Sequence, residues 1–309
     1  MNEVNNTPWK NVTYLLMADV IWGTAYVAQQ TGGKLLGSYT FNCIRFLLGA
    51  LVLLPVILLK DKFSEEKPKT DRRLLLKGGI ICGLALSAAS NFQQLGISMG
   101  SSVGKAGFLT SCYIVMVPIA GIPLGKKCSK GAALGVILAL WGMYLLCMTG
   151  ADMTICLSDI LLLICAVAFV LQILAIDHFA PMLDTVKMSF VEFLVCGLSS
   201  AVLMVFFEMG LSKESLVTWA APLSLPPVWL SIAYAGICSS GIAYSLQIAG
   251  QRNFNPTVAS LLMSLESVFS LVAGWILLHE RMSMTEMLGC LLIFMAVITA
   301  QLPEKRKKL

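Results

Sequence analysis

A single carboxylate, that of Glu266, stands near the middle of an apolar stretch that runs from Thr257 to Leu278. A helix of this length, rising about 1.5 Å per residue, measures roughly 33 Å and can cross the roughly 30 Å hydrocarbon core of a bilayer. A charge at the bilayer centre costs at least about 2.5–3.5 kcal/mol on insertion scales. Glu266 is therefore expected to load and release a proton or to bind a cationic solute. The alternative is a structural carboxylate bonded to neighbouring serines or to another helix.

The helix expected at 257–278 has two faces. At about 100° per residue, its polar and small residues fall within one arc of roughly 160°, and these are Ser260, Ser264, Glu266, Ser267, Ser270 and Gly274. The other face is expected to contact lipid and carries Leu261, Leu262, Leu265, Val268, Phe269, Val272 and Ile276. The polar face predicts that the other helices form the walls of a cavity opposite it.

A second carboxylate, Asp19, lies on a helical stripe with Gly23, Tyr26 and Gln30. The stripe presents a carboxylate, a phenol and an amide on one face, which suits a polar cation or an amino group. In the alternative interpretation, Asp19 lies near the cytoplasmic end of its span and reaches water or a lysine. Asp19 and Glu266 are the two candidates for proton coupling.

Two uncharged stripes have the same spacing, Ser87/Asn91/Gln94 and Ser240/Tyr244/Gln247. Either they line the cavity and bind polar groups of a solute, or they join helices, since small and amide residues do both in membranes. The cavity is also expected to include Thr110, Tyr113 and Ser270. Four aromatic residues could stack on an aromatic or cationic solute or simply pack, namely Trp22, Tyr26, Tyr113 and Tyr244.

The sequence lacks the constellations of common enzymes. It has two histidines, no H-E-x-x-H, no G-x-S-x-G and no phosphate-binding G-x-x-x-x-G-K-[ST]. None of its ten cysteines forms a C-x-x-C pair. We therefore expect no catalytic residue, no metal site and no cofactor, and the chain is not expected to be an enzyme.

The composition indicates a polytopic α-helical membrane protein. The chain is 57% hydrophobic and 13% charged, with a mean hydropathy of +0.81, whereas soluble domains are about 45–50% apolar and about 25% charged. The ten expected spans are Asn11–Gln30, Thr40–Leu59, Leu74–Leu95, Gly104–Leu124, Gly131–Thr149, Ser158–Ile176, Met188–Phe207, Val228–Ile248, Thr257–Leu278 and Thr285–Leu302.

The positive charges between the spans predict the orientation. Of 22 Lys and Arg residues, 17 lie on the side of the N-terminus, 4 on the opposite side, and Arg45 within a span. Cytoplasmic loops carry the excess of Lys and Arg, so both termini are expected in the cytoplasm. Because the basic residues cluster in these loops, the net charge of +5 does not indicate a nucleic-acid partner. The basic tail is expected to meet anionic lipid.

The chain also contains an internal repeat. Gly83, Ser87, Asn91, Gln94 and Ser98 match Gly236, Ser240, Tyr244, Gln247 and Gln251 at an offset of 153, and Arg45-Phe46-Leu47 matches Glu192-Phe193-Leu194 at 147. Two repeats of five spans each, 1–150 and 151–309, would enter the membrane in opposite orientations. Inverted repeats are typical of secondary transporters that work by alternating access.

Several motifs resemble the drug/metabolite transporter superfamily with two EamA domains. These are Ile21-Trp22-Gly23, Ile44-Arg45-Phe46, Phe108-Leu109-Thr110 with the following Tyr113 and Pro118, and Ser264-Leu265-Glu266 followed by Leu277-Leu278-His279-Glu280. The chain departs from the pattern at Ser267, where proline is frequent, and at Lys126-Lys127, where glutamate is common.

The resemblance implies an all-α bundle of ten transmembrane helices around a central cavity, lined by the first, third, fourth, sixth, eighth and ninth spans. It also implies transport of a small metabolite or drug-like solute across the bacterial inner membrane, by a monomer or a homodimer. The substrate is not indicated, since relatives carry amino acids, nucleosides, sugars and drugs. The alternative is an intramembrane receptor or assembly protein that transports nothing.

Overall fold

The computed structural model describes residues 8–63, 71–99, 103–126, 128–147, 155–210, 212–278 and 283–301, and within these ranges every regular element is a helix. The α-helices of the first part are α1 (Pro8–Leu35), α2 (Ser38–Phe63), α3 (Arg72–Ser98), α4 (Val103–Ser111), α5 (Tyr113–Gly121) and α6 (Lys130–Cys147). The later ones are α7 (Leu157–Phe179), α8 (Thr185–Met204), α9 (Lys213–Ala220), α10 (Pro226–Ala233), α11 (Ser245–Gln251), α12 (Pro256–Met263), α13 (Leu265–Leu278) and α14 (Met284–Gln301).

Short segments of other helix types join or extend these α-helices. Three are 3₁₀-helices: η1 (Ile122–Leu124), η2 (Ala180–Met182) and η4 (Ala221–Ser224). Two are π-helices, η3 (Val205–Met209) and η5 (Tyr234–Tyr244). Helix occurs at each of the ten ranges expected from the sequence, as far as these ranges are described.

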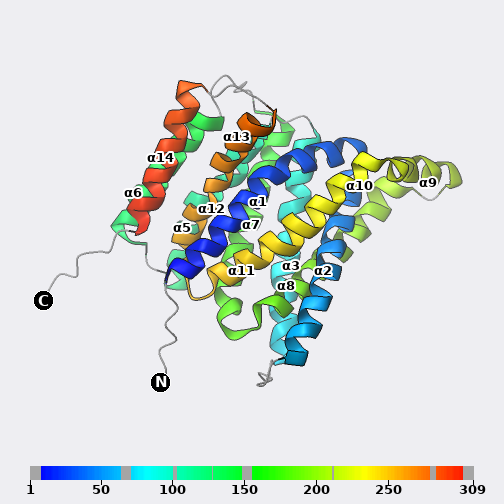
Figure 1. Cartoon of the computed structure of the whole chain (residues 1–309), viewed down its shortest axis with the longest axis horizontal. Helices are drawn as coiled ribbons and strands as arrows, with labels where there is room; N and C mark the ends of the chain where they lie inside the picture. The colour runs from blue at the N-terminus through cyan, green and yellow to red at the C-terminus, as the bar shows by residue number, and fades with distance from the viewer. Residues whose placement is uncertain are drawn as a thin grey trace, which may run out of the picture.

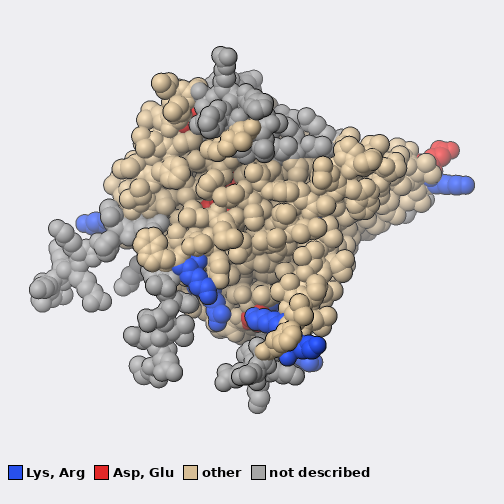
Figure 2. Space-filling model, viewed as in Figure 1, with Lys and Arg blue, Asp and Glu red and all other residues tan. Residues whose placement is uncertain are grey.

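Length and composition identify a multi-pass membrane protein. Among the described residues, 6 helical segments are long and apolar enough to cross a membrane: 38–63, 72–98, 106–124, 157–182, 185–209 and 226–251. Three apolar helices are shorter, at 130–145, 256–272 and 284–300. Large apolar side chains such as Leu58, Phe206 and Leu230 are exposed. Figure 2 shows a broad surface with few charges, which suits contact with lipid.

The helices pack side by side in one bundle (Figure 1). Two long pairs, α2 with α8 and α6 with α14, lie against each other along much of their length. Helix α3 packs on α7 and α8, while α1 packs on α13 and on the α10–η5–α11 segment. Helix α1 is 28 residues long but is not among the six segments that are both long and apolar enough to cross a membrane. It carries Asp19 and Gln29, both of which are buried.

Two of the predicted spans are broken near their middle. In one, the amide of Cys112 donates to the Leu109 carbonyl at 3.3 Å, and α4 gives way to α5. In the other, the amide and hydroxyl of Ser264 both donate to the Leu261 carbonyl, at 3.3 and 2.6 Å, between α12 and α13. Bonds to the third preceding residue tighten the backbone, and such irregular turns within membrane helices occur where the backbone lines a cavity.

A carboxylate of η3, the π-helix that follows α8, caps the N-terminus of α2. Glu208 accepts hydrogen bonds from the amides of Tyr39 and Thr40, at 2.8 and 2.7 Å, and from the Thr40 hydroxyl at 2.7 Å. Trp219 of α9 donates to that same hydroxyl at 2.8 Å. A negative side chain at the first amides of a helix satisfies donors that have no partner within the helix. Glu208 therefore fastens η3 and α9 to the start of α2.

The opposite end of α2 is held by ion pairs to α8. Lys60 contacts the N-cap Asp184 at 2.6 Å, and Lys187 contacts Asp61 at 2.7 Å. Burial raises the pKa of Asp184, but hydrogen bonds from Lys60 and from the amides of Lys187 and Val186 outweigh this, so the pKa lies below its ordinary value. Both ends of the α2–α8 pair are thus fixed by carboxylates.

We predict that Glu208→Ala lowers the free energy of unfolding by about 1–2 kcal/mol, because amides at the N-terminus of α2 lose their acceptor. Thermal unfolding of the purified protein in detergent measures the change. Glu214→Ala removes a carboxylate from exposed α9 and serves as the control with little expected effect. Equal melting temperatures for Glu208→Ala and Glu214→Ala would contradict the capping role.

Candidate functional site

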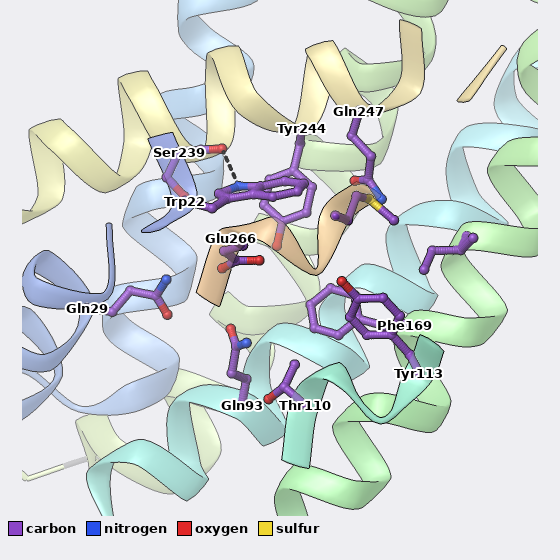
Figure 3. A pocket seen from close by; sticks show the side chains of 12 residues that line it. Trp22, Gln29, Gln93, Thr110, Tyr113, Phe169, Ser239, Tyr244, Gln247 and Glu266 are labelled. Atoms are coloured by element: carbon purple, nitrogen blue, oxygen red, sulfur yellow. Dashed lines mark hydrogen bonds between the residues drawn. The ribbon is translucent and has the colours of Figure 1, made fainter. Parts of the chain in front are cut away.

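A pocket lies inside the bundle (Figure 3). Its empty space is about 450 Å³, including the open solvent at its mouth. Its walls come from α1 (Trp22, Gln29), α3 (Gln93), α4 and α5 (Thr110, Tyr113), α7 (Phe169, Ile173), η5 (Ser239, Tyr244), α11 (Gln247), and α12 and α13 (Met263, Glu266). Both broken spans therefore reach the pocket close to their breaks.

Aromatic rings form much of the wall. Trp22 lies edge-on to Tyr244 with ring centroids 4.8 Å apart, and its indole N–H donates to the Ser239 carbonyl at 3.3 Å. Across the pocket, the rings of Tyr113 and Phe169 lie 6.2 Å apart. In Figure 3 these two pairs stand on different sides of the space, with Glu266 near Trp22. The rings offer π-faces and edges on which a solute can pack.

Glu266 is the acidic residue of the pocket wall, and Asp19 stands close behind it. Glu266 is partly exposed to the pocket, and the Tyr26 hydroxyl lies within hydrogen-bonding reach of its carboxylate. Asp19 is completely buried, and neither of its oxygens has a hydrogen-bond partner among the described residues. The two carboxylates are close enough to interact electrostatically. Like charges in a low dielectric repel strongly, so this pair requires a proton or another cation nearby.

Close contact between α1 and α13 brings the two carboxylates together. A Cβ atom at Gly23 would lie 2.7 Å from the Ser270 amide nitrogen and 2.8 Å from the Phe269 Cβ. Only a residue without a side chain permits this approach. The glycine of the Trp22-Gly23 motif thus has a packing role, while Trp22 faces the pocket.

Six of the residues predicted from the sequence line the pocket, namely Trp22, Thr110, Tyr113, Tyr244, Gln247 and Glu266. The other predicted residues are not part of its lining, namely Asp19, Tyr26, Ser87, Asn91, Gln94, Ser240 and Ser270. Asp19 and Tyr26 nevertheless adjoin Glu266, as described above, and Ser270 packs on Gly23.

The Ser87/Asn91/Gln94 stripe of α3 joins helices. The Asn91 amide donates to the Ser200 hydroxyl at 3.0 Å, and Ser199 donates to Ser87 at 2.7 Å. Gln94 donates to the Gln29 carbonyl of α1 at 3.2 Å. Ser240 is likewise buried, opposite Gly49 of α2. The Ser87/Asn91/Gln94 stripe therefore joins helices through hydrogen bonds, which was the second of the two interpretations given for it.

Sequence reasoning missed half of the lining, namely Gln29, Gln93, Phe169, Ile173, Ser239 and Met263. Gln93 and Ser239 directly precede the predicted Gln94 and Ser240 in the sequence. The prediction therefore chose the wrong one of two adjacent residues on each helix. Two further signals were present: Gln29 is a second amide in the first span, and Met263 is the repeat equivalent of Thr110.

The expected lipid face of 257–278 is largely wrong. Leu261, Leu262, Leu265 and Val268 are at most 3% exposed, because α12 packs on α1, α5, α6, α7 and α14, and α13 packs on α1, α4 and α14. Ile276, near the end of α13, is 58% exposed. This span is enclosed on all sides over its first half, since it contributes to the pocket from the centre of the bundle.

A second group of buried polar residues adjoins the pocket through Gln247. Gln172 donates to Glu192 at 2.9 Å and accepts from Gln247 at 3.2 Å. Arg45, the repeat equivalent of Glu192, forms no ion pair with it; its guanidinium lies over the Phe46 ring, 4.6 Å from the centroid. The Phe46 ring packs in turn on Tyr244 of the pocket wall, with ring centroids 5.9 Å apart.

Fold and pocket together define a polytopic α-helical membrane protein with an internal polar site. The chain matches the EamA-like transporter family over residues 9–148 and again over 157–300, and it belongs to that family. It is therefore a membrane transporter, and its family implies a small-molecule substrate.

Two relatives agree with this assignment, and a solved structure shares the fold. An uncharacterized transporter of Archaeoglobus fulgidus is 26% identical over 290 residues, which cover 93% of this chain and 84% of that protein. The uncharacterized transporter YoaV of Bacillus subtilis is 22% identical over 302 residues, which cover 95% of this chain and 97% of that protein. A crystal structure with 17% identity has a TM-score of 0.75 and covers 96% of this chain and 98% of its own, which shows a common fold.

We predict that Gly23→Ala lowers the free energy of unfolding by about 1–3 kcal/mol, because the added methyl group forces α1 away from α13. Gly107→Ala is the matched control, since a Cβ there has no neighbour within 4 Å. That change should be neutral or stabilising by about 0.5–1 kcal/mol, as expected for glycine to alanine within a helix. Thermal unfolding in detergent compares the two, and equal stability would refute the close contact at Gly23.

Proposed function

We propose that the protein is a secondary transporter that carries a small metabolite or drug-like solute by alternating access and couples this movement to protons. The observation that carries the proposal is the internal pocket with Glu266 in its wall and the unpartnered Asp19 behind it. Two buried carboxylates cannot both stay charged without a proton or another cation nearby. Such a pair would therefore bind or release a cation when the pocket opens to one side of the membrane or the other.

The two halves, 1–150 and 151–309, are proposed to be inverted repeats. The pairing of helices supports this. In the proposed repeat, α1 corresponds to α7, and α4 and α5 correspond to α12 and α13. Helix α1 packs on α12 and α13, and in the same way α7 packs on α4 and α5. The packing of α3 on α8 corresponds in the same way to that of η5 on α2. Two similar halves could exchange conformations and so give an inward-open and an outward-open state.

Charge distribution supports an orientation with both termini in the cytoplasm of a bacterium, across its inner membrane. Figure 2 shows most of the visible Lys and Arg side chains gathered at the lower side of the molecule, and a further one at the far end of α9. In Figure 1, the lower side holds the start of α1, the end of α2 and the start of α3. This is the asymmetry expected for cytoplasmic loops.

Protons are proposed to bind at the Glu266–Asp19 pair. Groups from several helices surround it: Tyr26 on α1, Tyr113 on α5, and Tyr244 on η5, with Arg45 of α2 behind Tyr244. Near neutral pH the tyrosines are uncharged and Arg45 is charged. The carboxylates are therefore the groups proposed to gain and lose protons.

We propose no catalytic activity, cofactor or nucleic-acid partner for this chain. Both halves contribute to the pocket, so a monomer contains a complete site, and a homodimer would hold two. Transport, rather than reception or assembly, is favoured because the polar site lies within the bundle instead of on its surface.

We predict that solute-dependent proton movement requires Glu266. The purified protein is reconstituted in liposomes with a trapped pH indicator, and amino acids, amines, nucleosides and sugars are added outside. One solute class should change the internal pH with the wild type, and Glu266→Gln should abolish that change, because an amide cannot carry the proton.

Glu214→Gln on exposed α9 should retain wild-type proton movement and is the control. Proton movement that persists in Glu266→Gln would refute the coupling role. Solute uptake that occurs without any proton movement, in the wild type, would retain the transporter and refute its coupling to protons.

A further inference from the structure

The one acidic side chain among the described residues that line the pocket is Glu266, while the hydroxyl and amide groups of the wall can both donate and accept. The Glu266 carboxylate only accepts when it is ionised, and Asp19 adds a second unpartnered carboxylate behind it. The indole N–H of Trp22, a donor, is already engaged by the Ser239 carbonyl. None of the described residues that line the pocket is basic. A solute that brings N–H donors and positive charge complements this wall.

Gln247 adds one more acceptor, and the network behind it fixes which end of its amide faces the solute. In the structure Gln172 turns its NH₂ group toward the Glu192 carboxyl group and donates to it at 2.9 Å. The Gln172 oxygen then accepts from the Gln247 NH₂ group at 3.2 Å. The Gln247 oxygen receives only a weak contact from Gln172, at 3.5 Å, and keeps its capacity to accept a bond from a solute.

Figure 3 agrees with this orientation, since the amide oxygen of Gln247 lies on the side nearer Glu266. Glu192 is completely buried and does not itself touch the pocket. It is a positioning residue: through Gln172 it holds Gln247 as an acceptor.

The remaining wall suits the apolar part of such a solute. Four rings, those of Trp22, Tyr113, Phe169 and Tyr244, surround the space together with Ile173 and Met263. Aromatic faces attract a cation within about 6 Å of the ring centroid as well as apolar groups. Arg45, a buried cation of α2, lies over the Phe46 ring, and that ring packs on Tyr244 of the pocket wall.

Building on the transport function proposed above, we propose that the pocket binds an organic primary ammonium ion with an aromatic body, its N–H groups donating to Glu266 and Gln247. A carboxylate on the solute has no cationic partner among the described residues that line the pocket. The preferred solute is therefore a simple amine rather than an amino acid.

The test measures binding to the purified wild-type protein in detergent at neutral pH, by calorimetry, with a set of matched probes. Phenethylammonium should bind at least roughly tenfold more tightly than phenylethanol, phenylpropanoate and L-phenylalanine, since each comparison removes the charge or adds an unpaired carboxylate. The N,N,N-trimethyl derivative of phenethylammonium keeps the charge and lacks N–H donors, and should also bind more weakly. Equal binding of the neutral, anionic and ammonium probes would overturn the proposal.

Two variants locate the site. Glu266→Gln should remove the preference for phenethylammonium over phenylethanol, whereas Glu214→Gln should leave it unchanged. Glu192→Leu should weaken binding of phenethylammonium severalfold while binding of phenylethanol stays constant, because Gln247 becomes free to turn its NH₂ group inward. A purely structural role of Glu192 would weaken both probes alike, and this result would overturn its positioning role.

Uptake of the radiolabelled probe into liposomes separates this proposal from the transport function. Binding of phenethylammonium without uptake would support the solute class and contradict transport. Uptake of another solute class, with no binding of phenethylammonium, would support transport and overturn the solute class.

Discussion

The central constraint on this structure is the cost of two carboxylates inside a membrane protein. Asp19 and Glu266 come from spans that are far apart in the sequence, yet they lie close enough to interact. Charges in a low dielectric need partners, water or a proton. The bundle encloses them in a polar site: the Tyr26 hydroxyl lies within hydrogen-bonding reach of Glu266, and the rings of Trp22 and Tyr113 form part of the pocket wall. The surface, by contrast, needs only to be apolar, and Figure 2 shows how few charges it carries.

Close helix packing makes this enclosure possible. Lipid chains are as apolar as leucine, so the helices do not associate through hydrophobic burial as in water. They associate through small residues and interhelical hydrogen bonds instead. Gly23 lets α1 approach α13, Gly49 lets α2 approach η5 beside Ser240, and Gly142 lets α6 approach α14. Asn42, Asn91 and Ser200 then bond α2, α3 and α8 together in one buried network. The polar stripes of the sequence thus serve two purposes, joining helices and lining the pocket.

The sequence predicted the helices well because span length and apolar composition are local properties. The facing of each polar residue was harder to predict. Gln93 lines the pocket and Gln94 bonds to α1, although they are adjacent and differ by about 100° in direction. Spacing within one helix establishes that residues share a face; it does not establish which neighbour that face meets. The prediction that Leu261 and Leu265 face lipid was wrong for the same reason. A span at the centre of a bundle is apolar where it packs against other helices as well as where it contacts lipid.

The proposed repeat places a phenol and a carboxylate at equivalent positions of one pocket. Thr110 and Tyr113 of the first half correspond, at an offset of 153, to Met263 and Glu266 of the second. All four line the pocket, and both pairs flank a break in their span. Equivalent backbone positions therefore present an alcohol and a phenol on one side, and a thioether and a carboxylate on the other. In the proposed cycle the two halves exchange their conformations, but they cannot exchange this chemistry. At this pair of positions the Glu266 carboxylate would stay with the second half in both states, and the Tyr113 phenol with the first.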